Sequence, residues 1–342
     1  MAETADSAGS ATAPVSAMAR LRRFLLFLGL SLLLVVALIA VDIFVLGLSA
    51  PARALSPHYY MALGDSISFG YQPNFDFSSG FADDIFNDLH SGPQGAQVTN
   101  IENLACAGET TETMIQGGCV ARFAHKGSYF GAQLTAALNF LKSSRNQGRV
   151  SPVTLEIGVN DVGNDIDVAT CSETSSAAAD LARMDNNLTQ IILPELQQAL
   201  TTSTGARAGD LTMLNYYNPY ARVCPNSVAL IHTLNSHLLA DAMQFKIPVV
   251  DVYNAFGGDS GMAGNICTLT WYCSAEHDIH PTTKGYRYIA DAVERTLGLP
   301  GGSLLPGIGV PASAPTAAPV IGAPASDLAP RNADVWRRPS LA

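Results

Sequence analysis

Short apolar segments alternate with amphipathic segments from residue 59 to residue 297, and this alternation strongly constrains the fold. Strands are expected at residues 59–63, 98–104, 153–157, 211–215 and 249–252. Helices are expected at residues 81–89, 131–144, 175–199, 227–245 and 282–297, with Pro194 straining or ending the third. Such alternation produces a mostly parallel sheet covered by helices on both faces. We therefore predict an α/β fold, a single three-layer α/β/α sandwich around a mostly parallel five-stranded sheet.

The first of these strands runs directly into Gly64, Asp65 and Ser66. The carboxyl ends of parallel strands are where open α/β sheets place their ligand sites. A serine hydroxyl is a weak nucleophile at neutral pH unless a base activates it and hydrogen-bond donors stabilise the oxyanion. Asp65 is assigned no catalytic role, because neighbouring residues of an extended segment point to opposite sides.

The N-terminal segment, residues 1–54, carries an export or anchoring signal. It is polar at first, then has a cluster of arginines at residues 20–23 and an apolar stretch at residues 24–50. The sequence Ala52-Arg53-Ala54 has the small-x-small form of a signal-peptidase site, with cleavage expected after Ala54. Residues 24–50 are also nearly long enough to span a bilayer, so retention as a membrane anchor is the alternative. Both alternatives place the rest of the chain outside the cell.

Composition excludes nucleic acid as a partner. Charged residues make up 14% of the 342-residue chain and its formal net charge is −10, so no basic surface is available for a phosphate backbone. A hydrophobic content of 48% is ample for one large core. Residues 298–342 are rich in proline and alanine without any hydrophobic period, which predicts a disordered tail.

All six cysteines lie outside the N-terminal segment, an even number that suits an oxidising compartment. The sequence permits several connectivities, and order and proximity favour Cys106 with Cys119, Cys171 with Cys224, and Cys267 with Cys273. No Cys-x-x-Cys pair occurs, so we predict no metal site. The protein is therefore expected to be extracellular or secreted, or anchored to the outer face of the cytoplasmic membrane.

Four sequence blocks lie at predicted strand ends or in the last loop. They are Gly64-Asp65-Ser66, Ala107-Gly108-Glu109, Gly158-Val159-Asn160-Asp161 and Asp278-Ile279-His280-Pro281. With these blocks in this order, the sequence resembles the SGNH, or GDSL-type, hydrolase family over about residues 58–297. The resemblance implies that residues 55–297 form an SGNH-type hydrolase domain.

The resemblance also implies the roles of individual residues. Ser66 is expected to be the nucleophile and His280 its general base. The oxyanion hole is expected to consist of the backbone N–H groups of Ser66 and Gly108 and the side-chain amide of Asn160. Glycine lets an N–H point into a tight site, and an amide donates a hydrogen bond without adding charge.

The acid of the triad departs from the family pattern. The family commonly has aspartate three residues before the histidine, where this chain has His277. Asp278, two residues before the histidine, is the predicted acid. The alternative is a Ser–His dyad in which a backbone carbonyl orients the imidazole.

Two further regions are interpreted from their composition. Asp161, Asp165 and Asp167 do not fit a calcium-loop pattern, so a solvated acidic loop is expected. Residues 254–274 are rich in glycine and cysteine and are expected to form a loop. This loop and residues 75–77 are expected to wall the acyl site.

The predicted protein is an exported, cofactor-independent serine esterase or lipase that hydrolyses carboxylic esters, either acyl lipids or simple esters, through an acyl-enzyme. A carbohydrate O-acetyl esterase is the alternative within ester hydrolysis. A non-catalytic surface binding module on a hydrolase scaffold is the alternative of another class. We expect a monomer whose partner is a small-molecule or lipid ester, with membrane attachment possible only through residues 24–50.

Overall fold

The computed structural model describes residues 59–91, 98–119, 125–201 and 209–299. By its internal contacts the chain divides into two units, residues 1–54 and residues 55–342, and all the described residues belong to the second. The predicted export signal and nearly all of the predicted tail lie outside the described residues. Within the described residues, no helix combines the length and apolar character needed to cross a membrane.

A five-stranded sheet forms the centre of the second unit, in the order β2-β1-β3-β6-β7. All four strand pairings are parallel, which confirms the predicted sheet. The strands are β1 (Tyr59–Gly64), β2 (Asn100–Asn103), β3 (Val150–Glu156), β6 (Leu211–Leu214) and β7 (Val249–Val250). The central strands are buried on both faces and therefore read as continuous apolar runs.

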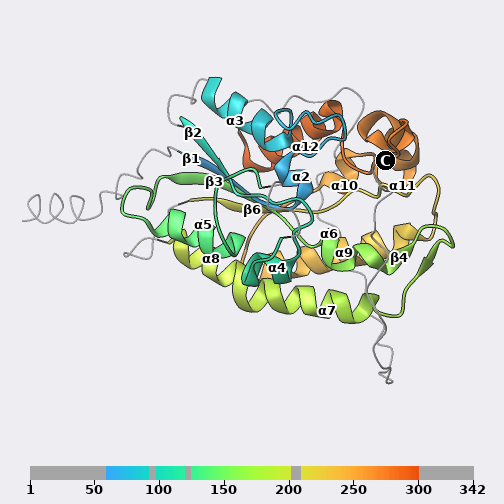
Figure 1. Cartoon of the computed structure of the whole chain (residues 1–342), viewed down its shortest axis with the longest axis horizontal. Coiled ribbons are helices and arrows are strands. Elements are labelled where there is room, and N and C mark those ends of the chain that lie inside the picture. The colour runs from blue at the N-terminus through green and yellow to red at the C-terminus, as the bar shows by residue number, and fades with distance from the viewer. Residues whose placement is uncertain (1–58, 92–97, 120–124, 202–208, 300–342) are drawn as a thin grey trace, which may run out of the picture. The chain divides into compact units, whose positions relative to one another are not determined.

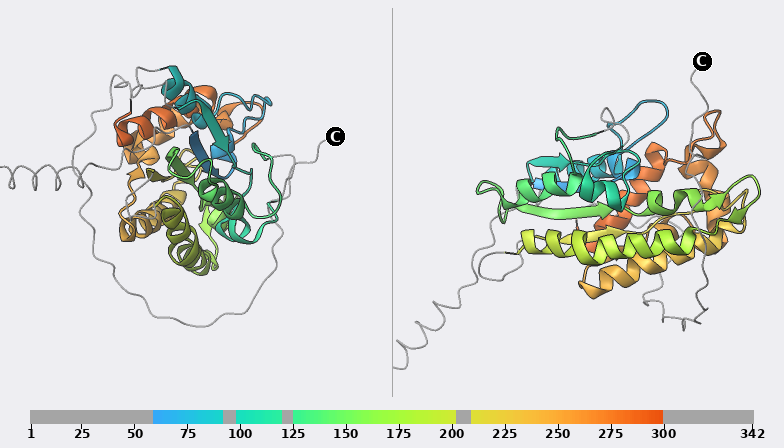
Figure 2. Two further views of the ribbon diagram at one scale, coloured as in Figure 1. Left: turned by 90° about the vertical axis from the view of Figure 1, so that its left-hand side faces the viewer. Right: turned by 60° about the horizontal axis from the view of Figure 1, so that its bottom comes forward.

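Helices cover both faces of the sheet, as the predicted three-layer sandwich requires (Figures 1 and 2). One face carries α3 (Phe81–Ser91), α10 (Val252–Ala255), α11 (Gly258–Leu269) and α12 (Thr283–Leu297). The other face carries α4 (Thr111–Gln116), α5 (Gln133–Lys142), α7 (Ala177–Asn187), α8 (Leu193–Ala199) and α9 (Ser227–Gln244). Short helices α2 (Ser66–Phe69) and α6 (Val159–Val162) follow β1 and β3 directly.

The last helix shows how local sequence fixes an element that supports the site. The Thr282 side chain caps α12 by accepting a hydrogen bond from the Gly285 N–H at 3.2 Å. Buried Tyr286, Ile289 and Val293 recur at helical spacing, so one stripe of α12 faces the core. The capped start fixes where the helix begins, directly after the loop that carries the predicted base.

The long helical segment at residues 175–199 is continuous. A π-helical turn, Leu188–Ile192, joins α7 to α8, and Pro194 lies in the first turn of α8. Proline has no N–H and crowds the carbonyl one turn before it, and the π turn changes the hydrogen-bond pattern of the helix at this point. The helix therefore does not end at Pro194, and the irregularity expected there is the π turn that precedes α8.

The prediction of a loop at residues 254–274 was wrong. Most of this segment is helical, in α10, α11 and a 3-10 turn at Trp271–Cys273. Glycine is a poor helix former, and the composition therefore suggested a loop. Met262, Ile266 and Leu269 are buried at helical spacing, and their packing outweighs the low propensity of the glycines.

The prediction of a solvated acidic loop was wrong for two of its three aspartates. Asp165 is buried and accepts hydrogen bonds from the hydroxyls of Thr174 at 2.5 Å and Ser176 at 2.6 Å. Asp161 is also buried, and its partners belong to the site described below. Only Asp167 is exposed. Hydroxyl and amide donors let a carboxylate be buried without a cation.

The three predicted disulfides are all present: Cys106–Cys119, Cys171–Cys224 and Cys267–Cys273. The first closes a segment that begins directly after β2 and contains Gly108. The third closes the end of α11 onto the 3-10 turn that precedes His280.

Candidate active site

Ser66 is the first residue of α2 and follows the tight turn that ends β1. The strand ends at Gly64, whose φ of 136° is rarely adopted by other residues, and an added Cβ would lie 1.8 Å from the Glu156 carbonyl oxygen. Asp65 caps α2, its Oδ1 accepting a hydrogen bond from the Ile67 N–H at 2.9 Å. The turn leaves Ser66 partly exposed although its neighbours Asp65 and Ile67 are buried.

The structure brings Ser66, His280 and Asp278 into one hydrogen-bonded line. His280 Nε2 lies 2.7 Å from Ser66 Oγ, and His280 Nδ1 lies 2.7 Å from Asp278 Oδ1. The same carboxylate oxygen also accepts the backbone N–H of His280 at 2.8 Å. An imidazole held in this way presents Nε2 to the hydroxyl as a proton acceptor.

The group at His280 Nδ1 is the carboxylate of Asp278. Burial raises the pKa of Asp278, but hydrogen bonds and the charge of His280 outweigh it, so its pKa lies below the ordinary value. Asp278 therefore stays ionised at neutral pH. His277, at the family's usual position for the acid, is exposed and its Nδ1 lies 3.3 Å from the Tyr272 carbonyl oxygen.

Sequence reasoning missed several contacts that hold the His280 loop in place. The buried Tyr217 hydroxyl donates to the Ile279 carbonyl at 2.8 Å, and the Trp271 N–H donates to the His280 carbonyl at 3.0 Å. The ring of Tyr71 packs against the imidazole with centroids 4.6 Å apart. Tyr217 follows β6, so its place after a strand end was the available signal.

The predicted oxyanion donors Gly108 and Asn160 follow the strands on either side of β1. Gly108 has a φ of 84°, and Asn160 lies in α6. The Asn160 amide donates to the Glu109 carbonyl at 2.9 Å, which ties it to the segment containing Gly108. Because the strands are parallel, their carboxyl ends meet at the edge of the sheet that carries Ser66.

Asp161 fixes the same two segments to each other. Its carboxylate accepts the Thr111 N–H at 2.9 Å and the Thr111 hydroxyl at 2.5 Å. Asn187 of α7 donates to that hydroxyl at 3.0 Å. The acid directly after Asn160 is thus a structural link between α6 and the start of α4.

Glu109 introduces a pH-sensitive buried charge beside this link. Its side chain is 1% exposed, and Gln133 donates to its Oε2 at 2.9 Å. Burial raises the pKa of Glu109 to about 7, although hydrogen bonds from Thr113 and Gln133 lower it. The folded protein therefore favours the neutral carboxyl.

We expect Glu109→Gln to stabilise the protein above pH 8 and to change little at pH 5. The pKa of Glu109 is higher in the folded than in the unfolded protein, so its contribution is complete below about pH 4.3 and is lost as pH rises through 7. The expected gain in unfolding free energy is about 1–3 kcal/mol at pH 8.5, measured by urea denaturation. The exposed Glu112→Gln is the control. An equal effect of Glu109→Gln at both pH values would contradict the assignment.

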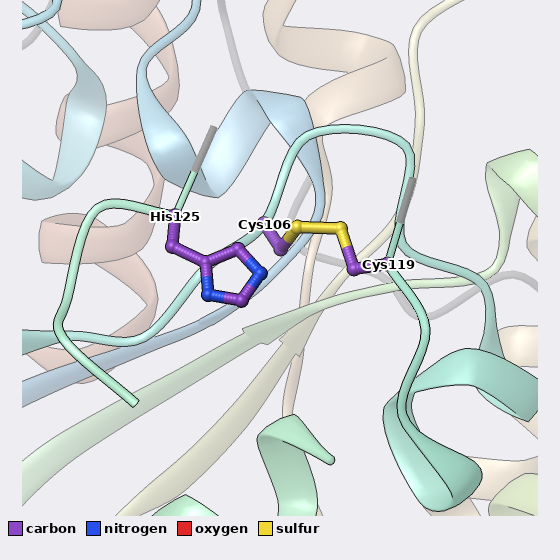
Figure 3. Close-up of side chains that lie close together, drawn as sticks. All are labelled: Cys106, Cys119 and His125. Atoms are coloured by element: carbon purple, nitrogen blue, oxygen red, sulfur yellow. A yellow bond between two sulfur atoms is a disulfide. The ribbon is translucent and has the colours of Figure 1, made fainter. Parts of the chain in front are cut away.

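The Cys106–Cys119 disulfide closes the segment that contains Gly108, and His125 lies beside it (Figure 3). One potential ligand atom from each of the three residues lies within 4.8 Å of the others. In the disulfide, however, both sulfurs are bonded to each other and offer no thiolate to a metal. The bridge instead restrains the turn between β2 and α4.

Replacing Cys106 and Cys119 together with serine is expected to lower kcat by about tenfold to a hundredfold, because small misplacements of positioned donors are costly. The Cys171→Ser, Cys224→Ser pair is the matched control, since that bridge does not enclose Ser66, Gly108 or Asn160 in the sequence. Steady-state kinetics of folded protein provides the measurement. Equal losses in the two variants would assign the effect to general destabilisation.

Residues 62–288 match the sequence model of the GDSL-like lipase/acylhydrolase family, which is well over half of the chain. The chain belongs to this family. The GDSL protein is therefore a serine ester hydrolase, and the resemblance seen in the sequence blocks is confirmed. No curated protein matches the sequence.

Several solved structures resemble this GDSL hydrolase. A lipase from a goat rumen metagenome is 16% identical, with a TM-score of 0.46, 70% of this chain and 96% of that chain covered. The extracellular lipase of Streptomyces rimosus is 20% identical, with a TM-score of 0.42 and coverages of 70% and 99%. The acetylxylan esterase Axe2 of Geobacillus stearothermophilus is 16% identical, with a TM-score of 0.43 and coverages of 72% and 97%.

Proposed function

We propose that Ser66 is the nucleophile of this ester hydrolase, His280 its general base and Asp278 the residue that orients and stabilises the imidazolium. The observation that carries the proposal is the line of two 2.7 Å contacts from Ser66 Oγ through His280 to Asp278. The Ser66 and Gly108 N–H groups and the Asn160 amide are the proposed oxyanion donors. The reaction needs only these groups, the ester and water, with no metal or other cofactor.

The proposed reaction has two halves. Ser66 Oγ bonds to the ester carbonyl carbon while its proton passes to His280 Nε2 and the carbonyl oxygen takes up negative charge. The tetrahedral intermediate collapses, the alcohol leaves with the proton from His280, and an acyl-enzyme remains. Water then attacks with the same base, and the carboxylic acid and free Ser66 are regenerated.

Asn160→Ala is expected to reduce kcat by about a hundredfold to a thousandfold with a much smaller change in KM, because an oxyanion donor acts mainly in the transition state. Steady-state kinetics on a short-chain ester provides the measurement. Asn187→Ala is a matched control, since this amide donates to the Thr111 hydroxyl without being a proposed donor to the oxyanion. A change confined to KM would remove Asn160 from the oxyanion hole.

We infer that the substrate is an ester with an apolar acyl group. A row of aromatic rings runs from the base to the solvent. Tyr71 packs on His280. The ring centroids of Tyr71 and Phe77 are 5.7 Å apart, and those of Phe77 and Phe75 are 6.1 Å apart. Phe75 is 77% exposed, so the row ends at the surface. Aromatic side chains of this kind supply apolar contact area along a bound chain.

The loop that presents these rings is held in place by its own polar groups. The Asp76 carboxylate accepts hydrogen bonds from the Ser78 N–H at 3.0 Å and the Ser79 hydroxyl at 2.7 Å. Buried Gln72 donates to the Asp76 carbonyl at 3.2 Å and accepts from the Trp271 indole at 3.3 Å. The loop thereby keeps one conformation beside the base, as a binding wall requires.

A series of esters that differ only in acyl length tests this substrate class. We expect kcat/KM to rise from acetyl to longer chains by about threefold or more for each pair of added methylenes, as far as the wall extends. Phe75→Ala should flatten this dependence and leave acetyl-ester hydrolysis unchanged. A strong preference for acetyl over longer chains would instead favour the carbohydrate O-acetyl esterase.

We further propose that the enzyme is exported and acts as a monomer, with residues 55–297 as the hydrolase domain and residues 298–342 as a tail. Three disulfides support an oxidising compartment. Sequencing the N-terminus of the mature protein separates the two routes. Leu55 as the first residue indicates cleavage after Ala54, and an intact Met1 chain in the membrane fraction indicates an anchor.

A further inference from the structure

Two carboxyl groups are buried together beneath the turn that carries Ser66. Asp65 is 0% exposed and Glu156, the last residue of β3, is 1% exposed. The two carboxyl groups lie close enough for the charge of Glu156 to raise the pKa of Asp65. Neither takes part in a salt bridge in the part of the chain that the structure describes. The catalytic roles proposed above use neither side chain.

The pair holds the backbone on both sides of Ser66. Asp65 Oδ1 accepts the Ile67 N–H at 2.9 Å, and Glu156 Oε2 accepts the Ser68 N–H at 3.2 Å. The Asp65 N–H in turn donates to the Glu156 backbone carbonyl at 3.2 Å. The position of Ser66 therefore depends on both side chains.

The surroundings of the pair disfavour two negative charges. Two ionised carboxylates in contact and out of water repel each other strongly, whereas one shared proton turns the repulsion into a hydrogen bond. Buried Glu156 Oε1 has no hydrogen-bond partner among the described residues, and a proton shared with Asp65 would give it one.

Five titratable groups act on the pair from the elements around it. Tyr216 and Tyr217 follow β6 in the chain. The Tyr216 hydroxyl donates to Asp65 Oδ2 at 3.2 Å, and Tyr217 lies close to Glu156. The other three groups near the pair are Glu109, which follows β2 in the chain, Tyr286 on α12 and His280 on the catalytic loop. Of these five, only His280 can become a cation, and it does so during the proposed reaction.

We propose that Asp65 and Glu156 share one proton, that this proton locks the turn in the geometry that aims Ser66 Oγ at His280, and that its loss slows the enzyme at alkaline pH. Both are positioning residues. The proposal rests on Ser66 being the nucleophile. Burial, followed by the charge of Glu156, raises the pKa of Asp65 well above its ordinary value, and burial raises the pKa of Glu156 as well.

Glu156→Gln tests the proposal because glutamine imitates the protonated glutamate. Its carbonyl can accept the Ser68 N–H while its amide donates to Asp65, and the pair can no longer gain a second charge. In Glu156→Gln, we expect kcat near pH 7 to stay within about threefold of the wild type. The fall of kcat at alkaline pH should move upward by at least about one pH unit or disappear. Asp65→Asn is the second variant and should move the decline in the same direction.

Glu294→Gln is the matched control, since Glu294 is a fully buried glutamate on α12 with a pKa raised to about 8 by burial. It should leave the alkaline decline in place. An unmoved decline in Glu156→Gln with kcat retained would overturn the proposal. If neither variant of the pair folds, infrared spectra of the wild type decide. A protonated-carboxyl band that persists above the pH where Glu109 and Glu294 titrate supports the proposal, and its absence contradicts it.

These outcomes are separate from a failure of the proposed function. If Ser66 is not the nucleophile, a serine-directed covalent inhibitor leaves it unmodified at every pH. If only the shared proton is wrong, the inhibitor modifies Ser66 with the same pH dependence in the wild type and in Glu156→Gln.

Discussion

Ser66→Ala is expected to reduce kcat by about 10⁴- to 10⁶-fold, the loss typical of removing the nucleophile from a triad. His280→Ala should cost about as much, and the double variant scarcely more, because the two residues act as a unit in one proton transfer. Among the described hydrogen bonds, the Ser66 hydroxyl contacts only His280, at 2.7 Å. The Ser66→Ala protein should therefore fold normally.

Thermal unfolding and circular dichroism check the fold, and steady-state ester hydrolysis measures the loss. Ser236→Ala is a matched control, because Ser236 is exposed on α9 and its hydroxyl donates to the His232 carbonyl, away from the site. Ser66→Ala with activity within tenfold of the wild type would remove Ser66 from the mechanism.

Asp278→Ala is expected to lower kcat by about 10²- to 10⁴-fold while Ser66 still reacts slowly with small inhibitors. The loss arises because Asp278 both orients the imidazole and stabilises its positive charge. Since the pKa of Asp278 is lowered, its carboxylate is charged at every pH where neutral imidazole can act as the base. Asp278→Asn, which keeps the shape and removes the charge, should lose a similar factor.

The neighbouring Glu276→Ala provides the control, because Glu276 is an exposed acid in the same loop with no contact to His280 among the described hydrogen bonds. It should retain wild-type activity. Equal activity of Asp278→Ala and the wild type would instead indicate a dyad in which a backbone carbonyl supports the imidazole.

The sheet could be predicted because most of its strands are short, largely apolar segments that alternate with amphipathic helices. The proposed nucleophile could be located because an apolar strand runs directly into Gly64-Asp65-Ser66 and this block is one of four in the order of the GDSL family. α11 could not be predicted, because its glycines suggested a loop. The burial of the Met262 and Ile266 side chains, which stabilises the helix, is evident only from tertiary packing.

The buried polar groups of the site were harder to predict than the reactive ones. Asp161 and Asp165 read as solvated acids because a sequence does not show which hydroxyls and N–H groups will surround a carboxylate. The positions of Glu156 and Tyr217 against the Ser66 turn and the His280 loop likewise depend on strand order. Asp278 could be named only as a candidate, since its offset from His280 differs from the family pattern.

The most direct test of the central proposal is covalent labelling of the folded, disulfide-intact protein with a fluorophosphonate, followed by peptide mass mapping. The proposed mechanism predicts a single adduct on Ser66, formed in step with the loss of esterase activity, and none in Ser66→Ala. Inactivation without an adduct on Ser66, or full activity after complete labelling of Ser66, would contradict it.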